Sequence, residues 1–113
     1  MKNAARKNLS LEEKLKIPVW KLPFSKEVKD ELYGKGVRSL KQIYDKCERY
    51  PGLSFFPGFK NRVFAESAHL IIAMGLDNKK YPLAEYVDIK IYSHGFLERK
   101  RRLKIDAYVN ERV

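Results

Sequence analysis

The chain has 113 residues and a formal net charge of +10, and hydrophobic residues make up 44% of it. This length suits one small domain, the composition is globular, and no apolar run is long enough to span a bilayer. The single cysteine, Cys47, excludes an internal disulfide, and the N-terminal residues lack the apolar core of a secretory signal. We therefore expect a cytoplasmic protein without a membrane partner. The positive charge favours a polyanion, nucleic acid ahead of an anionic membrane surface, with simple solubility as the alternative.

Residues 1–19 are predicted to form a basic N-terminal arm with one short helix. Ser10 and Glu13 have the spacing of a capping box, in which each side chain accepts a hydrogen bond from the other residue's free backbone N–H. Pro18 is expected to end this helix, since proline cannot continue the backbone hydrogen bonding.

Residues 20–76 are predicted to form a helical module. A helix is expected to begin after Ser25, with Val28 and Leu32 on one face, and to stop at the Gly34 and Gly36 turn.

The module is expected to continue with a helix that begins at Ser39, where Gln42 completes a second capping-box pattern. Cys47 falls on the apolar stripe of this helix and is interpreted as a small core residue. One short helical turn is expected over residues 53–56.

The last helix of the module is predicted to run from Lys60 to a C-terminal cap at Gly75. Its apolar face is wide and comprises Val63, Phe64, Ser67, Ala68, Leu70, Ile71 and Met74.

Residues 77–113 form a basic C-terminal extension. Apolar and polar side chains alternate over 86–92 and again over 103–109, a pattern that predicts a β-hairpin. A helix over 96–109 is the competing prediction, because Phe96, Leu103 and Ala107 also fit a helical face.

The stretch LPFSKEVKDELYGKGVRSLKQIYDK, followed by FPGFKNRVFAESAHLIIAMGL, resembles the C-terminal domain of the bacterial RNA polymerase alpha subunit. In that family a Leu-x-Leu-Ser start leads through two helices with a Gly-aliphatic turn to a final hairpin and helix that end in Gly-Leu. The resemblance covers about residues 20–76. The matching residues are Leu22, Phe24, Ser25, Leu32, Gly36, Val37, Leu40, Ile43, Arg62, Gly75 and Leu76.

This resemblance implies a mainly α, compact helix-hairpin-helix bundle that binds DNA through its minor groove and backbone and contacts transcription factors. Two family features differ here. Glu27 and Asp30 stand where the family has an arginine and an asparagine that contact DNA, and Lys60 stands where it has its hairpin glycine.

Three basic segments are candidate nucleic-acid contacts. The turn PGFKNR precedes a helix N-terminus, whose partial positive charge and N–H groups suit an anion, while the turn YGKGVR and the run ERKRRLK offer phosphate-neutralising cations. For both turns, the alternative is that the glycines only let the chain reverse. The candidate residues are Lys35, Gly36, Arg38, Lys41, Gly58, Lys60, Asn61, Arg62, Arg99, Lys100, Arg101, Arg102 and Lys104.

Neither catalysis nor a metal or other cofactor is indicated. His69 is expected to be a partly buried structural residue and His94 to lie in a turn, and neither has a second ligand at metal spacing. No nucleophile and base form a known motif, so we do not expect an enzyme.

The sequence thus predicts a DNA-binding protein of transcription or its regulation, nucleoid-associated and with double-stranded DNA as its ligand. The alternative is a protein-interaction module that mimics the alpha-subunit domain to bind RNA polymerase or a transcription regulator, without binding DNA itself. The acidic Glu27 and Asp30 favour this alternative, because they oppose contact with phosphates. Binding to RNA or to single strands is a third possibility.

Overall fold

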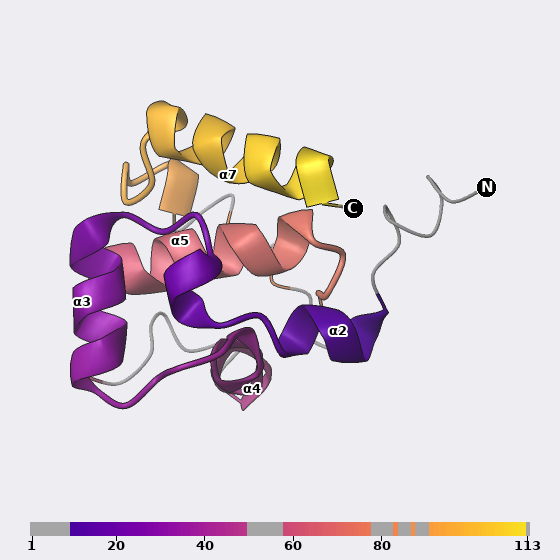
Figure 1. The fold of residues 1–113 in the computed structure, drawn as a ribbon. Coiled ribbons are helices and arrows are strands. Elements are labelled where there is room, and N and C mark those ends of the chain that lie inside the picture. The colour runs from indigo at the N-terminus through magenta and orange to yellow at the C-terminus, as the bar shows by residue number, and fades with distance from the viewer. Residues whose placement is uncertain (1–9, 50–57, 78–82, 84–86, 88–90, 113) are drawn as a thin grey trace.

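The computed structural model describes residues 10–49, 58–77, 83, 87 and 91–112, and within these ranges the chain is mainly helical with no strand. Figure 1 shows the order of the elements. They are α2 (Leu11–Leu15), the 3-10 turn η1 (Val19–Lys21), α3 (Lys26–Gly34), α4 (Leu40–Arg49), α5 (Asn61–Ala73) and α7 (Arg99–Arg112).

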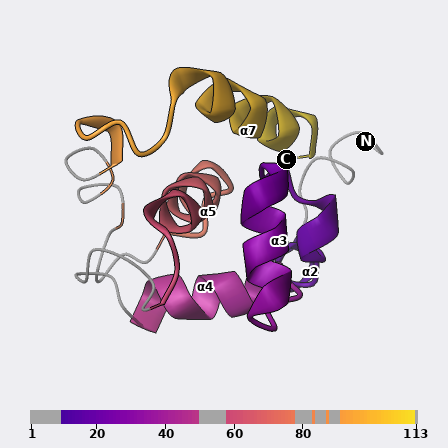
Figure 2. The ribbon, with the colours of Figure 1, turned by 90° about the vertical axis from the view of Figure 1, so that its left-hand side faces the viewer.

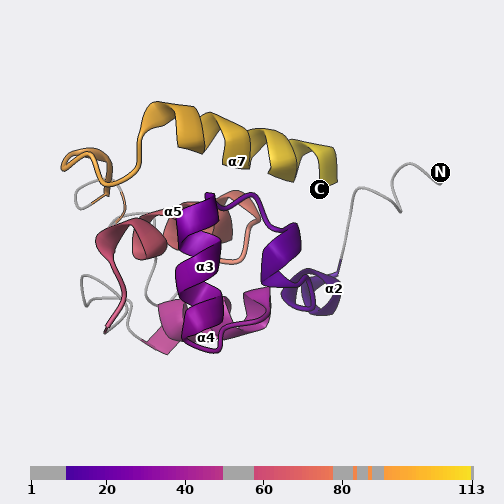
Figure 3. The same cartoon turned by 60° about the vertical axis from the view of Figure 1, so that its left-hand side comes forward.

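Helix α5 lies at the centre of the molecule. Helix α7 covers one side of α5, α4 lies on the opposite side, and α3 stands across them (Figures 2 and 3). Helix α2 packs against α4, and η1 packs against α3. Because three helices surround α5, its buried surface is wider than the stripe of a helix at the edge of a domain.

The predicted apolar face of α5 is confirmed, and all seven of its residues are buried. Six consecutive residues, 63–68, are inaccessible to solvent. Residues far away in the chain complete the same hydrophobic core, including Val19 from η1, Leu32 from α3 and Ile105 from α7.

The predicted helix boundaries follow local backbone chemistry. Ser10 and Glu13 form the capping box, with hydrogen bonds of 2.8 and 3.1 Å. After α5, Gly75 donates to the carbonyl of Ile72, and the N–H of Leu76 donates to that of Ile71, both at 3.0 Å. This pair of bonds is a Schellman cap, and the φ of +74° at Gly75 is one that glycine adopts without strain.

The turn after α3 repeats this cap. Gly36, at φ +82°, donates to Tyr33, and the N–H of Val37 donates to Leu32 at 2.9 Å. Gly36 is therefore the residue that stops the helix, while Gly34 is still part of it.

The predicted β-hairpin in the C-terminal extension is wrong. The competing prediction of a helix is confirmed for residues 99–109, but Phe96 lies before the helix, and Leu103 and Ala107 are exposed. Residues 103–109 lie within α7, Val87 is helical, and Ile91 and Tyr92 form a π-helical turn. Ile105 and Val109, four residues apart, are buried, whereas Leu103 is exposed. The buried residues therefore follow the four-residue spacing of a helix face and not the two-residue spacing of a strand. Arg, Lys and Ala in this segment also favour a helix.

The described residues do not include residues 1–9 of the predicted N-terminal arm, the short turn expected over 53–56 or the side chain of Cys47. Within the described ranges, no helix is long and apolar enough to cross a membrane.

Candidate nucleic-acid interface

The basic run at the start of α7 divides into an inward and an outward set. Arg101 points inward: its Nη1 donates to the carbonyl of Pro23 at 3.2 Å, and its Nε lies 4.0 Å from a carboxylate oxygen of Glu66. Arg102 places its guanidinium 4.6 Å from the centre of the Tyr92 ring. These two arginines hold α7 against the rest of the fold.

Arg99, Lys100 and Lys104 form the outward set and are exposed. Within the described part of the chain, no carboxylate pairs with any of them. The first turn of α7 contains no acidic residue, although the partial positive charge of a helix N-terminus favours one there. Positive charge is thus concentrated at this end of α7 and faces solvent.

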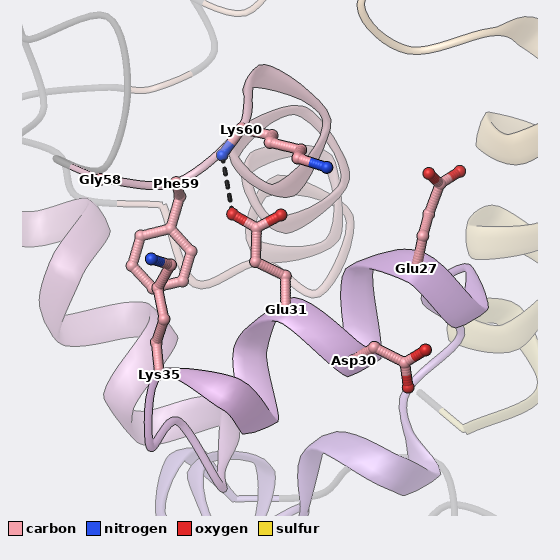
Figure 4. Close-up of a pocket in the computed structure, with 7 residues that line it drawn as sticks. All are labelled: Glu27, Asp30, Glu31, Lys35, Gly58, Phe59 and Lys60. Atoms are coloured by element: carbon pink, nitrogen blue, oxygen red, sulfur yellow. Dashed lines mark hydrogen bonds between the residues drawn. The ribbon is translucent and has the colours of Figure 1, made fainter.

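The N-terminus of α5 is already occupied by a carboxylate. Lys60 is the N-cap of α5, and its backbone N–H donates to Glu31 at 2.9 Å (Figure 4). Gly58 has a φ of +82°, which gives the turn its shape. Glu31 therefore accepts a hydrogen bond from a backbone N–H, that of Lys60, which was predicted to bind a phosphate. Its negative charge also repels an anion at this helix end.

An open pocket of about 640 Å³ lies beside this turn, between α3 and the start of α5. The Phe59 ring lies 5.4 Å from the ammonium groups of both Lys35 and Lys46. Glu27 and Asp30 project from α3 along the other end of the pocket (Figure 4). The pocket combines both signs of charge, whereas cations outnumber the neighbouring carboxylate of Glu98 at the start of α7.

Arg62, also a candidate phosphate contact, forms two ion pairs within the protein. Its Nε donates to Glu66 at 3.0 Å, and its Nη1 lies 3.2 Å from Glu27. The hydrogen bond with Glu66 raises the pKa of Arg62 above its ordinary value, helped by the charges of Glu27 and Glu98. Asn61, the neighbouring candidate, is exposed.

The candidates around Gly36 have internal contacts as well. Arg38 donates to the carbonyl of Tyr33 at 2.9 Å and stacks on the Tyr33 ring at 4.7 Å. Lys41 pairs with Asp45 at 3.1 Å, one turn along α4. The carbonyl of Gly36 accepts a hydrogen bond from the side chain of Gln42. Arg38, Lys41 and Lys35 nevertheless remain solvent-exposed, so each presents charge at the surface.

Glu66 was not singled out from the sequence. Its side chain is 0% exposed, and it accepts hydrogen bonds from the N–H and hydroxyl of Ser25 at 2.8 and 2.9 Å. Ser25 is the N-cap of α3, as predicted, but its hydroxyl bonds to Glu66 rather than to its own helix. The available signal was a carboxylate inside an apolar face with Arg62 four residues before it.

His69 is partly buried, as expected, and joins α5 to α7. Its Nε2 lies 2.9 Å from Asp106, and its Nδ1 hydrogen-bonds to the hydroxyl of Tyr92. His94 lies in the turn before Gly95. The described residues contain no group of three or more His, Cys, Asp or Glu side chains placed to hold a metal ion.

No protein-family model, curated protein or solved structure matches this chain.

Proposed function

We propose that this protein is a non-enzymatic DNA-binding protein whose main phosphate contact is the start of α7. The observation that carries the proposal is the outward set of Arg99, Lys100 and Lys104, which are exposed and have no acidic partner in the described ranges. Their charges add to the positive end of the helix dipole. These like charges repel one another. The phosphates of a DNA backbone reduce that repulsion, and counterions are released when the phosphates are neutralised, which gives affinity without sequence preference.

A role in transcription or its regulation is part of the proposal and rests on the resemblance of residues 20–76 to the alpha-subunit domain. On this proposal, residues 20–76 form a helix-hairpin-helix module with the core positions of that family. Leu22, Val37 and Ile43 are among the matching residues, and all three are buried. The turn at Gly58 has a smaller part in DNA binding, because Glu31 occupies the Lys60 N–H.

The experiment is a gel shift with a random-sequence DNA duplex at two salt concentrations, beside single-stranded DNA and RNA. We expect the wild-type protein to shift the duplex at low salt and to release it at high salt. Replacing Arg99, Lys100 and Lys104 together with alanine should weaken the shift. Equal binding by wild type and variant would contradict the assignment to α7, and the absence of any shift would contradict DNA binding altogether.

The pocket between α3 and α5 favours a second candidate function, a module that binds RNA polymerase or a transcription regulator. Its exposed carboxylates on α3, Glu27 and Asp30, repel phosphates but suit a basic protein surface. A pull-down with purified bacterial RNA polymerase distinguishes the two. Capture of polymerase that Glu27→Lys abolishes, without any shift of DNA, would select this second function.

A further inference from the structure

Trp20 is the one tryptophan of the chain, and it lies on the surface. Its side chain is 58% exposed, although its neighbours Val19 and Leu22 are buried in the core. Leu11 and Leu103 are about as exposed, but the indole differs from them in offering a flat aromatic face on which a planar ligand can stack.

The backbone just before Trp20 is fixed to the segment that precedes α4. The N–H of Val19 donates to the carbonyl of Arg38, and the N–H of Leu40 donates to that of Ile17, both at 2.9 Å. Between these bonds, Pro18 and Ser39 form an isolated β-bridge. The indole is therefore presented by a rigid segment, so little backbone freedom is lost when a ligand binds to it.

Two lysines contact Trp20, one at its ring and the other at its backbone carbonyl. The ammonium group of Lys21 lies 5.1 Å from the centre of the Trp20 ring, and that of Lys29 donates to the Trp20 carbonyl at 3.1 Å. Within the described ranges, no carboxylate pairs with either lysine. Nearby Lys26 differs, since it pairs with Asp30 at 3.0 Å.

An exposed aromatic ring beside cations that have no acidic partner has the chemistry of a single-strand nucleic-acid contact. A base stacks on an aromatic face without regard to its identity, and the adjacent phosphates take the cations. An apolar protein partner would use the ring but leave the lysines unpaired, and base-paired DNA keeps its base faces stacked within the duplex. The surface therefore fits an unpaired nucleotide best.

We propose that Trp20, Lys21 and Lys29 form a binding site for unpaired bases, with the base stacked on the indole and its flanking phosphates on the two lysines. This inference rests on the proposed function, because it assumes that the protein binds nucleic acid. It adds a second contact surface on η1 and α3, separate from the start of α7, and it specifies single-stranded segments as the ligand.

The emission of Trp20 reports on this site directly, because no other tryptophan contributes. A short oligo(dT) should quench it by stacking, and a blunt duplex of equal length should quench it much less. In an anisotropy titration with labelled oligo(dT), Trp20→Ala should weaken binding about tenfold, in line with the loss of one stacked base. The matched control is Leu11→Ala, which removes a similarly exposed apolar side chain from α2 and should leave binding unchanged.

Each result decides between the proposals. If the duplex binds but oligo(dT) neither quenches Trp20 nor depends on it, this inference is wrong and the proposed function stands. If neither ligand binds, both are wrong. If anionic phosphatidylserine vesicles shift the emission to the blue while oligo(dT) leaves it unchanged, the surface contacts lipid and the inference is again wrong. Because Trp20 is exposed, circular dichroism of Trp20→Ala should match that of the wild type.

Discussion

The carboxylate of Glu66 and the guanidinium of Arg62 form an ion pair of 3.0 Å along α5, with Glu66 fully buried and Arg62 partly exposed. Ser25 at the start of α3 donates two further hydrogen bonds to this carboxylate. Arg101 brings α7 to within 4.0 Å of it. One buried carboxylate thus connects α3, α5 and α7.

Removing this carboxylate should destabilise the protein strongly. Glu66→Ala leaves the N–H and hydroxyl of Ser25 without this acceptor and removes the nearer of the two carboxylates that pair with Arg62. Breaking such a pair from its buried side should cost about 3 kcal/mol of unfolding free energy. Urea denaturation followed by circular dichroism measures this change in the free energy of unfolding. Asp30→Ala is the control, because its ion pair with Lys26 is solvent-exposed and should contribute at most about 1 kcal/mol.

Gly34, the last residue of α3, and Gly36, in the turn after it, should respond in opposite ways to alanine. Neither position has an atom within 4 Å of an added Cβ, so only the backbone conformation matters. Gly36→Ala forces alanine into φ +82° and should cost about 1 to 2 kcal/mol. Gly34→Ala lies in the helix and should be neutral or stabilise by up to about 0.5 kcal/mol. Thermal melts of the two variants make the comparison, and equal melting temperatures would contradict the assigned cap.

The capping box of α2 should make part of the stability depend on pH. Hydrogen bonds from Ser10 lower the pKa of Glu13, so this carboxylate stabilises the fold above the ordinary glutamate pKa of about 4.3. The contribution is lost as the pH falls through the lower pKa of the folded state. Glu13→Gln should therefore be less stable than the wild type at neutral pH, and the difference should vanish in acid. A difference that persists unchanged at low pH would show that the charge is not responsible.

Local chemistry along the chain was enough to predict the starts and stops of most helices. Ser10 with Glu13 and the glycine after α5 each act within a few residues, so their effect is visible in the sequence. The C-terminal segment was harder, since Ile105 and Val109 fit a period of two and a period of four equally well. Only the packing of α7 against α5 decides between them.

The candidate site could be predicted in composition but not in detail. The basic run of α7 could be identified from the sequence. Its division could not, because the side chain of Arg101 points toward Glu66, which lies 35 residues earlier in the chain. The contact between Glu31 and Lys60 likewise joins two helices. The exposure of Trp20 could not be predicted, because it depends on the backbone hydrogen bonds that join the segment before it to Arg38 and Leu40. Each of these features arises from tertiary contacts between distant segments.

Glu31 should suppress anion binding at the N-terminus of α5. Glu31→Ala frees the Lys60 N–H and removes a negative charge, so the variant should bind duplex DNA more tightly and with a salt slope steeper by up to about 0.9, the value for one added phosphate. Asp30→Ala changes the net charge equally on the same helix without touching α5 and should add no contact. Anisotropy titrations would contradict this prediction if the two variants bound alike.

The salt dependence of duplex binding in two matched double variants tests the central claim most directly. Lys100→Ala with Lys104→Ala and, as control, Lys16→Ala with Lys26→Ala each remove two exposed lysines and the same net charge. If α7 carries the phosphate contacts, the first pair should lower the magnitude of the slope of log affinity against log salt by about 1.8, since each phosphate contributes about 0.9. The control should keep the wild-type slope. Equal slopes for both double variants would contradict the assignment of the phosphate contacts to α7.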